Sequence, residues 1–227
     1  MDKAVVLLSG GLDSATVLYL AKKEGFKCFC LIFDYGQRHH KEIKSAAAIA
    51  RAAKCEREVV KISLPWKGSA LLDDKIKIPG LTGSSAHRLT GVIPLTYVPG
   101  RNIIFLSFAL SYAEAIKARA IFIGAHAHDY SGYPDCRPEF YRAFNQAACR
   151  GTKAGAEKRK IGIRTPLINK TKAEIVRLGA RLGVPFALTW SCYRGEKQPC
   201  GECDSCYYRA KGFKEAGIKD PLIKDER

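Results

Sequence analysis

A glycine-rich turn near the N-terminus carries the residue types of an anion-binding site. Residues Ser9-Gly10-Gly11-Leu12-Asp13-Ser14 follow an apolar run over 4–8 that predicts a buried strand, and they precede a predicted helix over 15–24. A turn between a strand and a helix presents backbone N–H groups and the helix dipole to a negatively charged ligand. Glycine lets the backbone approach such a ligand closely. The sequence therefore predicts a phosphate site at 9–14.

This turn differs from two common nucleotide-binding motifs. It contains no G-x-x-x-x-G-K-[ST] and no G-x-G-x-x-G, so it is neither a Walker loop nor a dinucleotide fingerprint. Hydroxyl donors are available at Ser9, Ser14 and Thr16. The carboxylate of Asp13 either caps the helix or holds a metal ion that the phosphates share. An ordinary turn with two glycines and a helix cap is the alternative.

Four cysteines near the C-terminus have the spacing of metal ligands, Cys192-x7-Cys200-x2-Cys203-x2-Cys206. Four thiolates suit a closed, structural zinc site, and a [4Fe–4S] cluster takes the same ligand set. We favour zinc because the long first loop and the polar flanking residues are typical of a zinc knuckle. The remaining cysteines lack ligand spacing; we expect four to pack in the core and Cys136 to belong to a substrate loop.

The loop at 129–137 is dense in groups that can bind a heterocyclic substrate. Tyrosine stacks on rings, aspartate accepts from ring N–H groups, and arginine holds a carboxylate bidentately. The candidate residues in this loop are Asp129, Tyr133, Asp135 and Arg137. Arg101 and Asn102 come just before a helix predicted over 103–117 and can also face an anion or nucleotide, although a helix cap is the simpler role for Asn102.

Lys172 lies in the first turn of a helix predicted over 171–182, where its positive charge opposes the helix dipole. Thr171 and Glu174 form a capping box that starts this helix. The position of Lys172 therefore indicates a ligand phosphate, and a solvated lysine is the alternative. Our candidate catalytic residues are Asp13, Ser14 and Lys172.

Alternating predicted strands and helices position these groups. The predicted strands cover 4–8, 27–33, 56–62, 120–124 and 161–168, and the predicted helices cover 15–24, 41–53, 103–117, 138–150 and 171–182. This alternation predicts an α/β fold with a doubly wound parallel sheet, whose ligands bind beyond the carboxyl ends of the strands. Residues 65–91 are predicted to form a long loop or lid. We expect an ATP-binding domain over 1–185 and a small C-terminal zinc-binding module with a tail over 186–227.

Composition restricts the class of protein. Of 227 residues, 47% are hydrophobic, which is enough for a core, and no apolar run reaches the roughly 18 residues of a membrane span. The N-terminus enters a strand directly, so we expect no secretory signal and a cytoplasmic protein. Nine cysteines, an odd number, favour thiols or metal over disulfides. The net charge of +16 favours the hypothesis of a nucleic-acid partner. The basic residues are spread along the chain, however, so this support is weak.

Five motifs occur in order along nearly the whole chain. They are S-G-G-L-D-S at 9–14, D-Y-G-Q-R-H at 34–39, P-G-R-N at 99–102, D-Y-S-G-Y-P-D-C-R-P-E-F at 129–140, and S-C-Y with C-G-x-C-x-x-C at 191–206. In combination they resemble the 7-cyano-7-deazaguanine synthase family of the ATP-pyrophosphatase (PP-loop) superfamily. His126 and His128 depart from the pattern of that family, and their role stays open.

The resemblance implies an adenine nucleotide alpha-hydrolase-like fold and an ATP-dependent ligase. The implied reaction converts 7-carboxy-7-deazaguanine and ammonia to the nitrile precursor of queuosine and archaeosine, through an adenylated carboxylate and an amide. It implies ATP, Mg²⁺ and Zn²⁺, a homodimer, and no need for nucleic acid or a membrane. Whether the net products are AMP and pyrophosphate or ADP and phosphate stays open. The residues implied to bind ATP are Leu8, Ser9, Gly10, Gly11, Leu12, Asp13, Ser14, Ala15, Thr16, Val17 and Leu18.

Two other functions are open at this point. A tRNA-modifying PP-loop enzyme, such as a tRNA thiolase, suits the positive charge but requires a persulfide-forming cysteine, whereas the cysteines here are assigned to metal or core. A nucleic-acid-binding module built on the zinc knuckle leaves the phosphate turn unexplained. Tight, salt-sensitive binding of tRNA would favour either of these functions.

Overall fold

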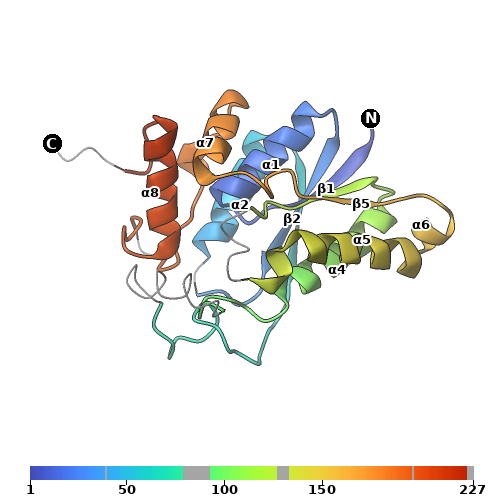
Figure 1. Ribbon diagram of the computed structural model, residues 1–227, viewed down its shortest axis with the longest axis horizontal. Helices are drawn as coiled ribbons and strands as arrows, with labels where there is room; N and C mark the ends of the chain where they lie inside the picture. The colour runs from blue at the N-terminus through green and yellow to red at the C-terminus, as the bar shows by residue number, and fades with distance from the viewer. Residues whose placement is uncertain (39, 79–92, 127–132, 196, 224–227) are drawn as a thin grey trace.

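Five parallel strands form one sheet in the order β3-β2-β1-β4-β5 (Figure 1). They are β1 (Lys3–Leu7), β2 (Lys27–Asp34), β3 (Glu56–Lys61), β4 (Ala120–Phe122) and β5 (Gly162–Arg164). The computed structural model describes residues 1–38, 40–78, 93–126, 133–195 and 197–223. The predicted α/β class with a parallel sheet is confirmed.

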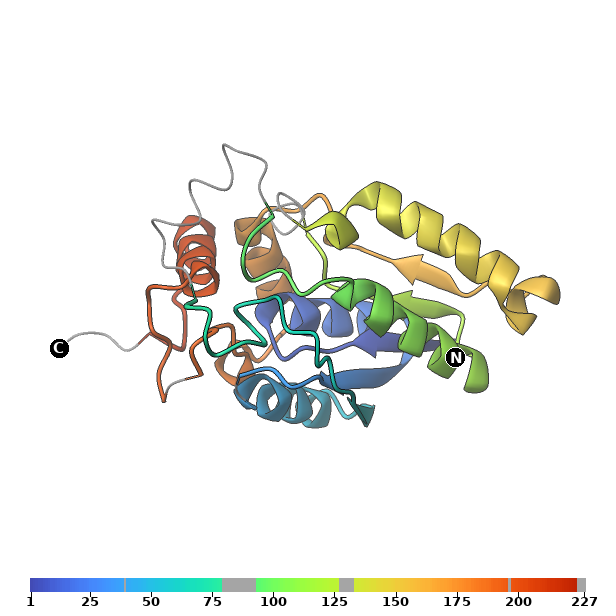
Figure 2. The same ribbon diagram turned by 90° about the horizontal axis from the view of Figure 1, so that it is seen from below.

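Side chains of the central strand alternate between two hydrophobic cores, as the two-residue period of a strand requires. Ala4 and Val6 belong to the core on one face, and Val5 and Leu7 belong to the core on the other. The first core contains residues of α1 (Leu12–Lys23), α2 (Lys41–Ala52), α7 (Lys172–Arg181) and α8 (Asp204–Ala216). The second contains residues of α4 (Arg101–Ala115) and α5 (Pro138–Gly151). Helices therefore cover both faces of the sheet (Figures 1 and 2).

The direction in which strands are added reverses beside β1. From β1 the chain continues outward through β2 and β3, and then returns to place β4 on the opposite side of β1. In open parallel sheets such a reversal opens a crevice at the carboxyl ends of the two strands. The residues at this point are Leu8–Ser9 after β1 and Ile123–His126 after β4.

Element boundaries differ from the predictions by one to a few residues, most clearly at α1 and in the strand predicted over 161–168. Helix α1 begins at Leu12 rather than at residue 15, because Gly11 already serves as its N-cap. Of the strand predicted over 161–168, only Gly162–Arg164 pairs, since the chain then turns through a hydrogen bond from Ile168 N to Thr165 O. In the loop predicted over 65–91, residues 65–78 contain no helix or strand, and 79–91 lie outside the described residues.

Helix α8 is a long helix that was not predicted from the sequence. It lies beside α7 (Figure 1), and Phe213 from α8 packs in the same core as β1. Cys206, Arg209 and Phe213 are buried at spacings of three and four residues, a helical period that the cysteine motif obscured. The described residues also contain three short helices: η1 (Pro134–Cys136), α6 (Lys153–Ala156) and η2 (Phe186–Leu188).

Within the described residues, every helix is too short or too polar to cross a bilayer.

Candidate functional site

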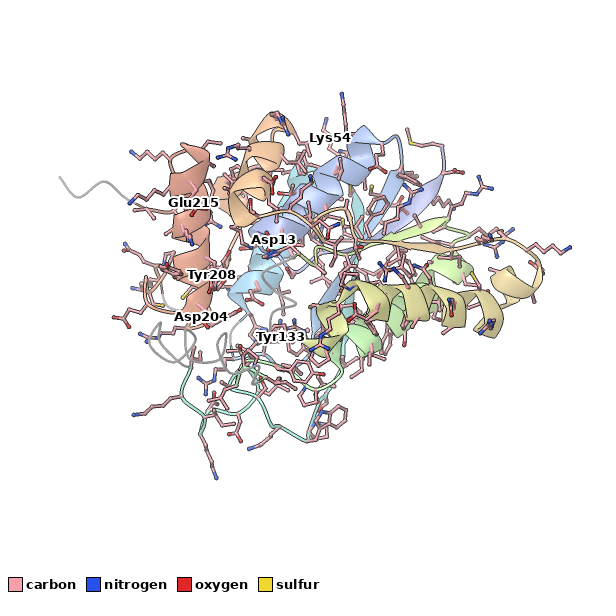
Figure 3. The ribbon with its side chains drawn as sticks, viewed as in Figure 1. Asp13, Lys54, Tyr133, Asp204, Tyr208 and Glu215 are labelled. Carbon is pink, nitrogen blue, oxygen red and sulfur yellow. The ribbon has the colours of Figure 1, made fainter. Side chains whose placement is uncertain are left out.

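A cavity of about 340 Å³ opens where the strand order reverses. Its lining includes Leu8 and Ser9 after β1, Gly124 and His126 after β4, and residues of α8. Four of its lining residues are labelled in Figure 3: Asp13 at the start of α1, Tyr133 just before η1, and Asp204 and Tyr208 on α8. This volume lies within the range of about 300–1,000 Å³ that is typical of small-molecule sites.

The turn over residues 9–14, where a phosphate site is predicted, is called the phosphate turn below. Hydrogen bonds of its own hydroxyl groups stabilise it. Ser9 Oγ donates to Ser14 Oγ at 3.1 Å, and Ser14 Oγ donates to the Gly11 carbonyl at 3.0 Å. The Gly11 N–H donates to Ser9 Oγ at 3.3 Å. The turn therefore leads directly into the first turn of α1, whose orphan N–H groups are the donors that an anion needs.

Gly10 brings the turn against the start of α2. Its φ of +88° lies in the left-handed region, and an added Cβ would stand 2.3 Å from the Glu42 carbonyl oxygen. The Gly10 carbonyl accepts a 2.9 Å hydrogen bond from Trp190 N. The Trp190 ring in turn lies 4.0 Å from Lys41 Nζ. Only glycine fits both the conformation and the close approach.

The segment implied to bind ATP divides between the cavity and the core. Leu8, Ser9, Gly11, Leu12, Asp13 and Ser14 line the cavity. The following four residues are buried in α1, and Thr16 Oγ1 donates to the Leu12 carbonyl within the helix at 2.9 Å. These four are Ala15, Thr16, Val17 and Leu18. Gly10 is buried behind the turn.

The three charged and titratable groups nearest the turn form a connected set. Lys172 Nζ donates to Asp13 Oδ1 at 2.9 Å and to Oδ2 at 2.8 Å. It also lies 2.8 Å from Nε2 of His126, a ring that is fully buried. Burial alone would raise the pKa of Asp13, but Lys172 and His126 hold that pKa well below its usual value of 3.8. The carboxylate therefore stays ionised at any physiological pH.

Two local features place Lys172 at the turn. The predicted capping box is confirmed, since Thr171 Oγ1 accepts from Glu174 N while Thr171 N donates to the Glu174 carboxylate. Gly212 of α8 faces the aliphatic stem of Lys172, and a Cβ there would lie 2.3 Å from Lys172 Cγ. Helix α8 can therefore pack directly against Lys172 only because residue 212 is a glycine.

Asp135 and Asn102 join η1 to the start of α4. The Asn102 N–H donates to Asp135 Oδ2 at 3.0 Å, and Asn102 Nδ2 donates to the Asp135 carbonyl at 3.2 Å. Asp135 is buried and stands outside the cavity lining, whereas Asn102 is part of that lining. Asp135 therefore supplies the acceptor for a first-turn N–H of α4, a place where helices lack internal partners.

The other proposed substrate residues fall into three groups. Arg101 and Tyr133 line the cavity; Arg101 Nη1 lies 3.5 Å from the Tyr35 hydroxyl, and the Tyr133 hydroxyl lies 2.6 Å from Thr96 Oγ1. Arg137 is exposed at the N-cap of α5. Asp129, like His128, lies outside the described residues.

Glu42 is a cavity residue that the sequence analysis did not identify. Burial raises the pKa of its carboxyl to about 7, an effect that the charge of Arg101 reduces. No hydrogen bond to this carboxyl occurs among the described residues. Glu42 belongs to α2, so its position in the cavity follows from the contact of α2 with Gly10.

The C-terminal segment supplies a whole wall of the cavity. The residues that contribute are Trp190, Ser191, Tyr193, Asp204, Ser205, Tyr208 and Arg209. Arg209 is fixed by Asp220, with Nε 2.7 Å from Oδ2 and Nη2 2.9 Å from Oδ1. The cysteine spacing predicted only metal binding in this segment, and the unpredicted helix α8 carries several of these side chains to the cavity.

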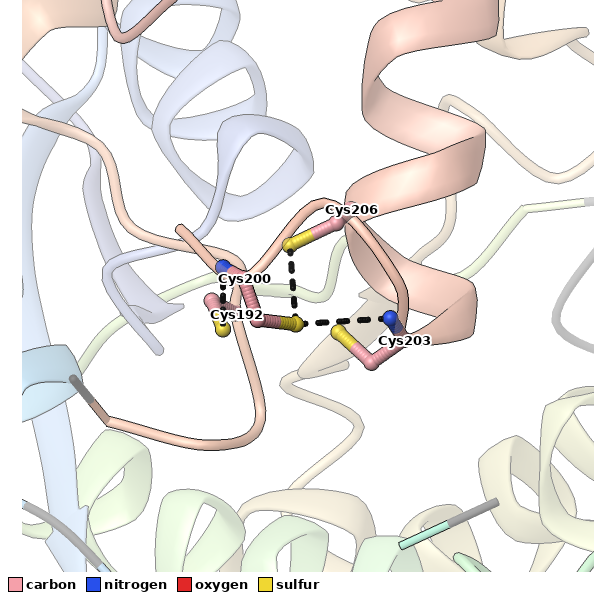
Figure 4. Close-up of side chains that lie close together, drawn as sticks. All are labelled: Cys192, Cys200, Cys203 and Cys206. Carbon is pink, nitrogen blue, oxygen red and sulfur yellow. Dashed lines mark hydrogen bonds between the residues drawn. The ribbon is translucent and has the colours of Figure 1, made fainter. Parts of the chain in front are cut away.

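The four C-terminal cysteines come together as the spacing predicts (Figure 4). Their sulfur atoms all lie within 4.8 Å of one another, and Cys200 Sγ is 3.9 Å from Cys206 Sγ. Backbone N–H groups of Cys200 and Cys203 point at sulfur atoms of the set. The four cysteines can therefore hold a metal ion.

Comparisons with known proteins identify the family to which the chain belongs. The family described as "Queuosine biosynthesis protein QueC" matches residues 3–217. A 7-cyano-7-deazaguanine synthase of Thermoplasma volcanium is 54% identical over 97% of this chain and 90% of its own length. One from Acetivibrio thermocellus is 53% identical, with 100% of both chains covered.

Among solved structures, an NMN synthetase from Francisella tularensis aligns with a TM-score of 0.48 at 19% identity, covering 99% of this chain and 79% of its own. A likeness at that level supports no conclusion about activity. The family match covers all the elements from β1 to α8 and includes the phosphate turn, the Lys172 helix and the four cysteines. The chain belongs to the family of queuosine biosynthesis protein QueC.

Proposed function

We propose that this protein is a 7-cyano-7-deazaguanine synthase, which uses ATP to convert 7-carboxy-7-deazaguanine and ammonia to the nitrile. The observation that carries the proposal is the cavity at the strand reversal. The phosphate turn and Lys172 line this cavity together with Arg101 and several aromatic residues. Relatives that are 50–54% identical over nearly the whole chain have this name. A nucleotide and a planar heterocyclic acid are the two ligands that such a cavity suits.

The reaction needs ATP because a carboxylate does not react with ammonia, since the leaving group would be oxide. In the proposed first step, a carboxylate oxygen of the substrate attacks the α-phosphorus of ATP and pyrophosphate leaves. Ammonia then attacks the carbonyl carbon, and AMP leaves to give the amide. A second activation, now at the amide oxygen, followed by loss of AMP and of the remaining amide protons gives the nitrile.

The phosphate turn and Lys172 would bind the β,γ-pyrophosphate as it leaves. The N–H groups at the start of α1 are fixed donors, and fixed donors aimed at developing charge are the main source of such stabilisation. Mg²⁺ is commonly held by one or two carboxylates and by substrate phosphates. Asp13 offers that carboxylate at the cavity wall, and Mg²⁺ there would neutralise phosphate charge.

On the substrate side, Arg101 would orient the carboxylate, because guanidinium groups bind carboxylates bidentately. The aromatic side chains of Tyr133, Tyr193 and Tyr208 line the same cavity and can contact the ring. Arg137 is exposed, and Asp135 lies outside the cavity lining, so we give them supporting roles in holding the loop before α5.

For the four cysteines we propose one structural Zn²⁺. With Zn–S bonds of about 2.3 Å, two sulfurs of a tetrahedral site lie about 3.8 Å apart. The 3.9 Å separation of Cys200 and Cys206 and the 4.8 Å limit for the whole set suit four sulfurs on one ion. In a [4Fe–4S] cluster each thiolate binds a different iron, so the sulfurs would stand further apart. Zinc supplies folding free energy at such a site.

The proposal also includes a homodimer in the cytoplasm, following the family resemblance, and a division into an ATP-binding domain over 1–185 and a zinc-binding module over 186–227. The module would dock through Phe213, which packs in the main core. Light scattering on the purified protein tests the dimer.

Mass spectrometry of products tests the function. Purified protein with ATP, Mg²⁺, ammonium and 7-carboxy-7-deazaguanine should form the amide and then the nitrile, with no requirement for tRNA. The same mixture without ATP is the control. If the acid keeps its mass while added tRNA becomes modified, the proposal is wrong and a tRNA-modifying enzyme replaces it.

A further inference from the structure

Asp204 lies at the cavity wall and has one carboxylate oxygen without a hydrogen-bond partner among the described residues. It is the first residue of α8 and lines the cavity together with Ser205 and Tyr208. That oxygen, Oδ1, is buried. An acceptor that loses its water on burial and gains no hydrogen-bond partner costs about 1–3 kcal/mol of folding free energy. A ligand that brings an N–H donor to this carboxylate removes that cost.

The other acids near the cavity are already engaged or differently placed. Both oxygens of Asp13 accept from Lys172, and Asp135 accepts from Asn102 outside the cavity lining. Glu42 lies beside the phosphate turn, where its carbonyl faces Gly10, and burial raises the pKa of its carboxyl to about 7. Among the described cavity residues, Asp204 is therefore the acid best placed to accept hydrogen bonds away from the phosphate turn.

The substrate of the proposed function carries a matching group. A 7-deazaguanine has a ring N–H next to an exocyclic amino group, so one edge presents two adjacent donors. A carboxylate has two oxygens that can accept from such a pair in parallel. The carboxylate torsion of aspartate is soft, so a small rotation turns either oxygen to the ligand.

We propose that Asp204 is the specificity-determining residue that reads the amino-pyrimidinone edge of the 7-deazaguanine. This inference rests on the proposed function and names the recognising side chain within the same site. In this arrangement the substrate ring binds against α8, and ATP binds against the phosphate turn. The carboxyl group of the substrate then lies between them, near Arg101.

Calorimetric titration without ATP tests this, because binding is then separate from turnover. The ligands are 7-carboxy-7-deazaguanine and its analogue that lacks the 2-amino group. The wild-type protein should bind the analogue at least ~10²-fold more weakly, since sites built on substrate hydrogen bonds reject analogues that lack them. Asp204→Asn should bind 7-carboxy-7-deazaguanine ~10²-fold more weakly than the wild type does, because the charged acceptor of its two donors is lost. The affinity of Asp204→Asn for the analogue should stay within about threefold of the wild-type value.

Two matched variants accompany Asp204→Asn. Glu215→Gln removes an exposed carboxylate from the other end of α8 (Figure 3) and should leave both affinities unchanged. Glu42→Gln removes the other cavity carboxyl that lacks a hydrogen bond. Zinc content and thermal melting of each variant establish that α8 and the metal site are intact.

The outcomes separate the inference from the proposed function. If the wild-type protein binds neither compound, the proposed function fails. If it binds both equally, or if discrimination is lost in Glu42→Gln and kept in Asp204→Asn, the assignment to Asp204 is overturned. The comparison of the two ligands on the wild-type protein decides the matter even if Asp204→Asn does not fold.

Discussion

Lys172 donates from Nζ to both carboxylate oxygens of Asp13 and lies 2.8 Å from Nε2 of His126. An ammonium group has three N–H donors, and these three atoms crowd around it. A phosphate that binds Lys172 must therefore replace one partner. Mg²⁺ bound with the nucleotide would attract the Asp13 carboxylate, so we expect Asp13 to be the partner that Lys172 releases.

Asp13→Asn tests that exchange. We expect turnover to fall by about 10²–10³-fold, the effect of removing one group that stabilises charge in a transition state. The melting temperature at pH 7 should fall only modestly as the ion pair is lost, because the pair borders an open cavity where water can solvate Lys172. Turnover and thermal melts measure the two effects, with Asp2→Asn in the exposed pair with Arg119 as control. Near-normal turnover of Asp13→Asn would show that Asp13 has only a structural role.

The stability contributed by Asp13 has a defined pH window. The native pKa lies below the usual 3.8, so the contribution is fully present well above that value and declines progressively as the pH falls below it toward the lower native pKa. Asp13→Asn should therefore narrow the difference between melts at pH 7 and at pH 3. An unchanged difference would contradict the ion pair.

Gly212→Ala should disturb Lys172 without touching the cavity directly. The new Cβ would lie 2.3 Å from Lys172 Cγ, close to the backbone of α7, so the lysine stem must shift. Displacements of about 1 Å cost up to 10²-fold in rate, and we expect kcat/KM for ATP to fall by 10–100-fold. Gly151→Ala is the matched control, because a Cβ there meets nothing within 4 Å. Equal kinetics for the two variants would contradict this role of Gly212.

Asp135→Ala should lower stability as well as activity. It leaves the Asn102 N–H without its acceptor in a buried place, which costs about 1–3 kcal/mol of unfolding free energy. Chemical denaturation measures this loss. Arg137→Ala, at an exposed position in the same loop, should be nearly neutral in stability. A stable but inactive Asp135→Ala would instead indicate direct contact with the substrate.

Metal removal should abolish substrate binding together with the fold of α8. Elemental analysis is expected to find one zinc per chain, and Cys203→Ser should lose the metal and soluble protein. The reason is that α8 begins at Asp204, directly after Cys203, and carries cavity residues. Iron with acid-labile sulfide, or a metal-free variant that remains stable and active, would contradict the zinc assignment.

The phosphate turn, the capping box at Thr171 and the four cysteines could be predicted from the sequence because each is local. Their residues lie within a few positions of one another, so backbone geometry alone brings them together. The alternation of strands and helices likewise determined the parallel sheet, since each strand needs a crossover before the next. The sequence also placed 9–14 and the residues after β4 at one edge of that sheet.

What only the tertiary structure decided are the contacts between distant segments. Lys172 meets Asp13 across 159 positions, and α8 brings Asp204 and Tyr208 to a cavity that begins at Leu8. Asp135, which its chemistry marked as a substrate residue, instead holds Asn102 at the start of α4. Sequence reveals which groups are able to bind a ligand. Whether a buried carboxylate faces a ligand or a backbone N–H depends on packing between elements, which no local pattern contains.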